Sequence, residues 1–65
     1  MKITVNGATY ETGAVTLAAL LSELGHDGAV VATAVNGEFA GRASRAETML
    51  RAEDEIEIVA PMQGG

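Results

Sequence analysis

The chain has 65 residues, a formal net charge of −5 and no cysteine. This length allows one small domain, which buries only about 60% of the surface that its unfolded chain exposes. The absence of cysteine excludes a disulfide framework, a thiolate nucleophile and a zinc–sulfur site. A single histidine, His26, leaves little from which to build a histidine metal site or a catalytic triad.

Only four residues are basic, and the isoelectric point is near 4.5. Nucleic acids and anionic membranes are therefore expected to be poor partners, and a basic protein surface is the favoured docking target. No apolar run approaches the roughly 20 residues that cross a bilayer, and no signal-peptide pattern opens the sequence. These features predict a cytoplasmic protein that is a monomer when alone.

The first 12 residues have the pattern of a hairpin. Ile3 and Val5 alternate with polar residues, which predicts a half-buried strand over residues 1–6. Asn6-Gly7 is typical of a type I′ turn, whose two central residues both need a positive φ. The return strand is expected over residues 8–12.

A short helix is predicted next, over residues 17–24. Its apolar residues have the spacing i, i+3, i+4, i+7, which places them on one face: Leu17, Leu20, Leu21 and Leu24. Thr16 is a suitable N-cap, and Gly25 follows where a left-handed C-cap is expected. Such a short helix is unstable alone, so its leucine face must pack on a sheet.

A β-rich run over residues 29–35 leads into a second turn signal, Asn36-Gly37, and a short return strand over residues 38–40. After it, Ser44 and Glu47 have the spacing of a capping box, which predicts a single helical turn.

The last strand is expected over residues 55–59, where Ile56 and Ile58 alternate with glutamates. A helix between two hairpins places the first and last strands side by side and parallel. The sequence therefore predicts an α+β fold of the β-grasp (ubiquitin-like) type. It has a mixed four- to five-stranded sheet with one helix across one face. Residues 1–59 form this domain, and residues 60–65 form an extended, flexible tail.

Four carboxylates cluster around the last strand: Glu53, Asp54, Glu55 and Glu57. They could be read as acid–base residues or as a magnesium site. Since charged side chains prefer solvent, we interpret them as turn residues and the outward row of an amphipathic strand, a solvated acidic face. No catalytic residue and no metal site are predicted inside the domain.

The chemistry is expected in the tail instead. Six residues from Ala60 extend roughly 20 Å. Pro61 cannot continue a central strand, whereas Gly64 and Gly65 lack a Cβ and fit a narrow channel. Such an arm is suited to presenting its carboxylate to the active site of another protein.

Together these residues resemble the ubiquitin-like sulfur carriers, and among them the ThiS family of thiamine biosynthesis. The resemblance spans the whole chain, and its most specific piece is the ending Met62-Gln63-Gly64-Gly65. Its other elements are Asn6-Gly7, Leu20-Leu21, Val35-Asn36-Gly37-Glu38, Arg42, Leu50, Asp54 and the strand Glu55-Ile56-Glu57-Ile58-Val59.

The resemblance implies a carrier that is not an enzyme. An activating partner of the ThiF type would adenylate the Gly65 carboxylate, with the ATP and magnesium bound by that partner. A relay through a cysteine desulfurase or a rhodanese would then supply sulfur to form a thiocarboxylate, which a ThiG-type thiazole synthase consumes. Gly65 would carry the sulfur, Gly64 would give clearance, and Gln63, Met62 and Pro61 would contact the channel walls.

Two alternatives stay open from the sequence. The same thiocarboxylate chemistry could serve molybdopterin or another sulfur metabolite, or the chain could be a ubiquitin-like tagging or interaction module. The sequence also departs from the family pattern at three positions. Arg45 stands in place of tryptophan, which removes a bulky anchor, and Gly41 stands in place of proline. Glu53 stands in place of glycine, at a position where a positive φ would cost about 1 kcal/mol.

Overall fold

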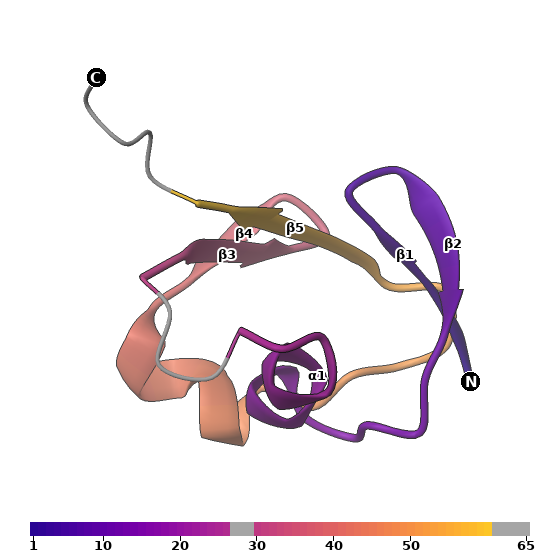
Figure 1. Cartoon of the computed structure of the whole chain (residues 1–65), viewed down its shortest axis with the longest axis horizontal. Coiled ribbons are helices and arrows are strands. Elements are labelled where there is room, and N and C mark those ends of the chain that lie inside the picture. The colour runs from indigo at the N-terminus through magenta and orange to yellow at the C-terminus, as the bar shows by residue number, and fades with distance from the viewer. Residues whose placement is uncertain (27–29, 61–65) are drawn as a thin grey trace.

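The computed structural model describes residues 1–26 and 30–60 of the chain. The elements follow in the order β1 (Lys2–Val5), β2 (Ala8–Glu11), α1 (Leu17–Glu23), β3 (Ala32–Val35), β4 (Glu38–Ala40), the 3₁₀ helix η1 (Arg42–Glu47) and β5 (Glu55–Val59). The strands form one sheet in the order β2-β1-β5-β3-β4. β1 and β5 are parallel, and the other neighbours are antiparallel. Figure 1 shows α1 against one face of this sheet. The predicted β-grasp architecture is confirmed.

Both predicted Asn-Gly turns are present. Asn6 and Asn36 have φ values of 50° and 53°, and the glycines after them have φ values of 85° and 84°. A positive φ at both central residues defines the type I′ turn, which matches the right-handed twist of the two strands that it joins. The sequence therefore sets the register of both hairpins, with Val5 opposite Ala8 and Val35 opposite Glu38.

The helix begins at Leu17 as predicted and ends one residue earlier than predicted, at Glu23, with Leu24 as its C-cap. The Thr16 hydroxyl accepts a hydrogen bond from the Ala19 N–H at 3.1 Å, and Gly25 follows the helix with a φ of 83°. The core lies between the leucine face of α1 and the inward side chains of the central strands. Its most deeply buried apolar members are Ile3, Leu17, Leu20 and Ile56, each at most 1% exposed.

The capping box predicted at Ser44 is wrong. η1 begins earlier, with Gly41 as an N-cap that has no side-chain hydrogen bond. The Ser44 N–H already donates to the Gly41 carbonyl at 2.9 Å, so Ser44 lies inside the helix rather than at its start. The Ser44 carbonyl accepts from the Thr48 hydroxyl at 2.8 Å, which closes the end of this segment.

The expected loss of an anchor at Arg45 is also corrected. The Arg45 guanidinium fastens η1 to the sheet, because Nε donates to the Thr33 hydroxyl at 3.1 Å and Nη2 donates to the Val31 carbonyl at 2.6 Å. The Thr33 hydroxyl in turn donates to the Ala40 carbonyl at 2.7 Å. A hydrogen-bonded arginine thus fixes the irregular segment without a bulky apolar side chain.

The acidic cluster divides into two parts. Glu53, Glu55 and Glu57 are exposed, as predicted, but Asp54 is only 9% exposed. Its carboxylate accepts hydrogen bonds from the Asn36 side chain at 2.9 Å and from the Arg51 N–H at 2.8 Å. Asp54 is therefore a structural carboxylate that closes the turn before β5, and its assignment to the solvated face is wrong.

Glu53 has a φ of 73°, as its departure from glycine suggested. We expect Glu53→Gly to raise the free energy of unfolding by about 1 kcal/mol, because glycine has no Cβ to strain this conformation. Ala52→Gly is the matched control, because Ala52 is the exposed residue next to Glu53 and does not have a positive φ. It should lower stability by about 0.5–1 kcal/mol. Denaturant unfolding of both variants measures the difference, and a loss of stability in both would show that Glu53 is not strained.

Candidate functional site

The five site residues predicted from the sequence lie outside the described residues: Pro61, Met62, Gln63, Gly64 and Gly65. The structure does describe the strand that leads to them. β5 lies in the middle of the sheet, and Ala60 follows it as an exposed residue. The site is therefore built from what holds β5 and from the surface around its end.

On one side, β5 is held by β1 and by the side chain of Asn6. The Asn6 N–H donates to the Ile56 carbonyl at 2.8 Å. Beyond this point the β1 chain turns away into its hairpin, and the Asn6 amide continues the pairing. Its Nδ2 donates to the Ile58 carbonyl at 3.0 Å, and its Oδ1 accepts from the Ile58 N–H at 2.8 Å. An asparagine amide offers one acceptor and a donor group, so it substitutes here for a backbone peptide.

On the other side, β3 pairs with β5 from Ala32↔Val59 to Val35↔Ile56. Asn36 closes this end as Asn6 closes the other. Its N–H donates to the Glu55 carbonyl at 2.7 Å, and its Oδ1 accepts from the Glu55 N–H at 2.9 Å. Each Asn-Gly turn therefore forms a hairpin and also fixes one part of β5. This second role had not been predicted, since nothing local in the sequence signals it.

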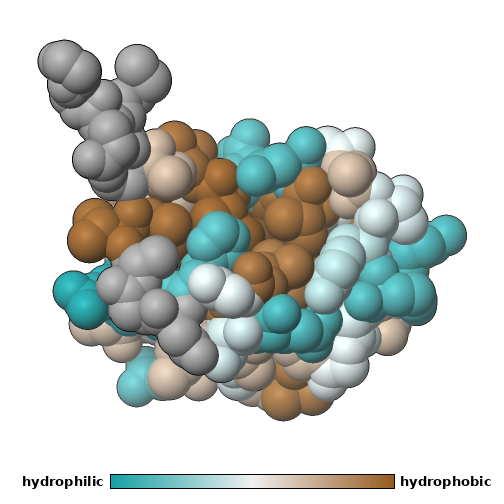
Figure 2. Space-filling model, viewed as in Figure 1, coloured by the Kyte–Doolittle hydropathy of each residue, from teal (hydrophilic) through white to brown (hydrophobic). Residues whose placement is uncertain are grey.

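The outward face of the sheet becomes apolar where β5 ends. Glu55 and Glu57 are exposed at the start and middle of the strand, but the next outward residue is Val59, which is 61% exposed. Figure 2 shows hydrophobic surface gathered along this end of the sheet. We call the apolar set the docking face; its members are Val30, Ala32, Ala34, Phe39 and Val59.

The docking face contains one aromatic and one aliphatic side chain that are both highly exposed to solvent. Phe39 is 77% exposed and Val30 is 75% exposed, more than any other large apolar residue that the structure describes. Ala34 lies between Glu57 and Phe39 in the register, and Ala32 lies opposite Val59. Since alanine side chains are short, the surface is lower at these two positions than at their larger neighbours. An apolar hollow of about 260 Å³ is lined by Val30, Val31, Ala32 and Val59.

A polar cluster on the inward side of the sheet joins α1 to β2. The Tyr10 hydroxyl donates to Oε2 of Glu23, and the Thr12 hydroxyl donates to Oε1 of Glu23 at 2.9 Å. The hydrogen bond from Tyr10 to the Glu23 carboxylate raises the pKa of Tyr10, and desolvation and the negative charge of Glu23 act in the same direction. These contacts fasten the helix to the hairpin.

Within residues 1–26 and 30–60, no three His, Cys, Asp or Glu side chains gather in a way that could hold a metal ion. In the same part of the chain, no helix is long and apolar enough to cross a membrane. The described residues therefore offer an exposed apolar surface beside a strand that is hydrogen-bonded on both sides.

The family model named ThiS family matches residues 3–65 of the chain. The chain belongs to the ThiS family. A similar solved structure is the thiamine biosynthesis protein ThiS from Geobacter metallireducens, with 33% sequence identity and a TM-score of 0.85. The match covers all of both chains. No curated protein matches the sequence significantly. The resemblance drawn from the Asn-Gly turns, the last strand and the Gly-Gly ending is thereby confirmed.

β5 also determines where the described chain ends relative to the docking face. In this member, β5 carries the chain to Ala60 beside the docking face, so a protein that covers Val59 and Phe39 would also meet the start of residues 60–65. The sequence contained one signal for this face. The alternation of the last strand ends on Val59, where another glutamate would have kept the outward row polar.

Proposed function

We propose that this chain is a sulfur carrier of thiamine biosynthesis and that the carboxylate of Gly65 is the group that carries the sulfur. The observation that carries the proposal is the match to the ThiS family over residues 3–65. The full-length likeness to a solved protein described as a thiamine biosynthesis protein supports it.

The proposed chemistry takes place at the carboxyl group of Gly65. A Gly65 carboxylate oxygen attacks the α-phosphorus of ATP, and pyrophosphate leaves to give an acyl adenylate. The terminal sulfur of a persulfide then attacks the acyl carbon, and AMP leaves. A thiol of the sulfur relay cleaves the resulting S–S bond, which releases the thiocarboxylate. A ThiF-type partner supplies the nucleotide site and the magnesium, and a ThiG-type thiazole synthase takes the sulfur.

Under this proposal the domain contributes recognition rather than catalysis. The docking face offers contiguous apolar surface beside the start of the tail, the kind of patch that marks a protein interface. Glu55 and Glu57 continue the same side of β5 with negative charge. We infer that the partner presents apolar groups toward Val59 and Phe39 and basic groups toward the two glutamates. Such charges would speed the encounter at low salt.

The proposal is tested by intact-mass analysis after incubation with a ThiF-type enzyme, ATP and a sulfur donor. We expect a mass gain equal to the replacement of one oxygen by sulfur, located at Gly65 by fragmentation. Gly64→Val should abolish the gain because its branched side chain blocks a narrow channel. Gly13→Val is the control, since a Cβ at Gly13 meets nothing within 4 Å. No gain in the unmodified chain would refute the carrier function, and transfer to an acceptor other than thiazole synthase would change the pathway.

The docking face has its own test. Phe39→Asp should raise the KM of the activating enzyme for this carrier by about tenfold or more, because burying a charge in an apolar contact weakens it by more than 1.4 kcal/mol. Val15→Asp is the matched control, because Val15 is 59% exposed and lies two residues before α1, which covers the other face of the sheet (Figure 1). Both variants should unfold at nearly the same temperature as the parent. An equal KM for the two variants would exclude the docking face.

A further inference from the structure

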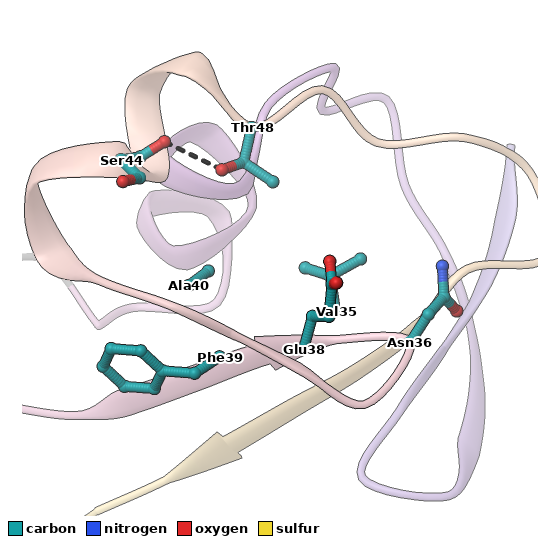
Figure 3. A pocket seen from close by; sticks show the side chains of 7 residues that line it. All are labelled: Val35, Asn36, Glu38, Phe39, Ala40, Ser44 and Thr48. Carbon is teal, nitrogen blue, oxygen red and sulfur yellow. Dashed lines mark hydrogen bonds between the residues drawn. The ribbon is translucent and has the colours of Figure 1, made fainter.

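A second concave surface lies on the helix side of β4 and shares Phe39 with the docking face. It is a groove of about 490 Å³ between the β3–β4 hairpin and η1. Figure 3 shows the side chains that line it: Val35, Asn36, Glu38, Phe39, Ala40, Ser44 and Thr48. Because β4 is an outer strand of the sheet, the groove is open to the side.

The groove combines an apolar base with polar groups at its rim. Val35 and Ala40 turn toward the helix side of the sheet, and Ala40 is 8% exposed. Glu38 stands beside Val35 and is directed toward Thr48 (Figure 3). Glu38 is the one ionisable side chain among the seven lining residues. Among the residues that the structure describes, no cation forms an ion pair with it.

The remaining rim groups are hydrogen-bond acceptors. The Thr48 hydroxyl donates its proton to the Ser44 carbonyl at 2.8 Å, so its oxygen is left to accept. The Ser44 hydroxyl makes no hydrogen bond with another described residue. The Asn36 amide does not contribute, because Asp54 and Glu55 already occupy it. The groove thus offers one carboxylate and two hydroxyls above a short apolar base.

An arginine side chain matches this arrangement better than other side chains do. Its three methylene groups can lie on Val35 and Ala40, while the head remains at the polar rim. The planar guanidinium has five N–H donors, which suits acceptors that approach from different directions. The net charge of −5 further favours a cationic visitor.

We propose that the groove between β4 and η1 receives an arginine side chain of a partner protein. Glu38 pairs with the guanidinium, and Val35 and Ala40 contact its stem. This contact is independent of the Gly65 chemistry, because it uses the helix side of the sheet and residues that do not belong to the docking face, apart from Phe39. A partner could thereby recognise this protein at the β4 edge of the sheet.

The test is a titration of the whole ¹⁵N-labelled chain with N-acetyl-arginine amide, followed by amide chemical shifts. We expect saturable shifts confined to Glu38, Ala40, Ser44 and Thr48 and their neighbours. N-acetyl-citrulline amide, which has nearly the same shape but no charge, should bind at least fivefold more weakly. Glu38→Gln should weaken arginine binding about fivefold. Glu57→Gln, which removes an exposed carboxylate from the other face of the sheet, should leave it unchanged.

Three results would overturn the proposal. Equal binding of citrulline and arginine amides would reduce the groove to an apolar hollow. Equal weakening by Glu38→Gln and Glu57→Gln would show general attraction to an acidic protein. Shifts that rise linearly without saturation would show that the groove holds no arginine. None of these results depends on whether Gly65 accepts sulfur.

Discussion

The pairing of β5 with both of its neighbours is the interaction on which the rest of this structure depends. β5 closes the sheet between two hairpins that are otherwise separate, and it leads to the residues proposed to carry the chemistry. Its pairing with β1 covers two residue positions, and its pairing with β3 covers four. Asn6 and Asn36 extend these short pairings with their side-chain amides. If they were lost, Ile58 and Glu55 would each keep a backbone N–H without that partner, at a cost of about 1–3 kcal/mol where it is buried.

This arrangement lets a small domain keep a large apolar surface outside. The inward residues of β5, Ile56 and Ile58, are buried against α1, whereas Val59 and Phe39 face solvent. A chain of this size has little core to spare. Side-chain hydrogen bonds therefore contribute to its stability, and they are distributed around the sheet. Glu23 links α1 to β2, Arg45 links η1 to the start of β3, and Asp54 stabilises the turn before β5. The outer face remains available for a partner.

Most of the fold followed from local sequence. Asn6-Gly7 and Asn36-Gly37 fixed two turns, the leucine spacing fixed α1, and the alternation of Ile56 and Ile58 fixed the inward face of β5. In each case the deciding residues lie within one turn or one strand, so backbone geometry and burial are enough to predict the outcome.

What the sequence did not predict depends on residues far apart in the chain. Asn6 bonds to Ile58 across 52 positions, and Asn36 bonds to Asp54 across 18. The burial of Asp54 and the anchoring role of Arg45 likewise appear only when two hairpins and η1 meet. The same distinction applies to the site. The Gly-Gly ending is a local pattern that indicated the proposed chemistry. The docking face, in contrast, depends on β3, β4 and β5 lying side by side in the sheet.

The Asn6 side chain pairs with the end of β5 through its two hydrogen bonds to Ile58, and this pairing is central to the structure. Amide hydrogen exchange in Asn6→Gly and Asn36→Gly tests it directly, because glycine accepts the positive φ of both turns and removes only the side-chain amide. We expect Asn6→Gly to speed exchange of the Ile58 amide about tenfold or more beyond any change at Glu55, and Asn36→Gly to do the reverse. Uniform acceleration of both amides in both variants, or no change at Ile58 in Asn6→Gly, would contradict it.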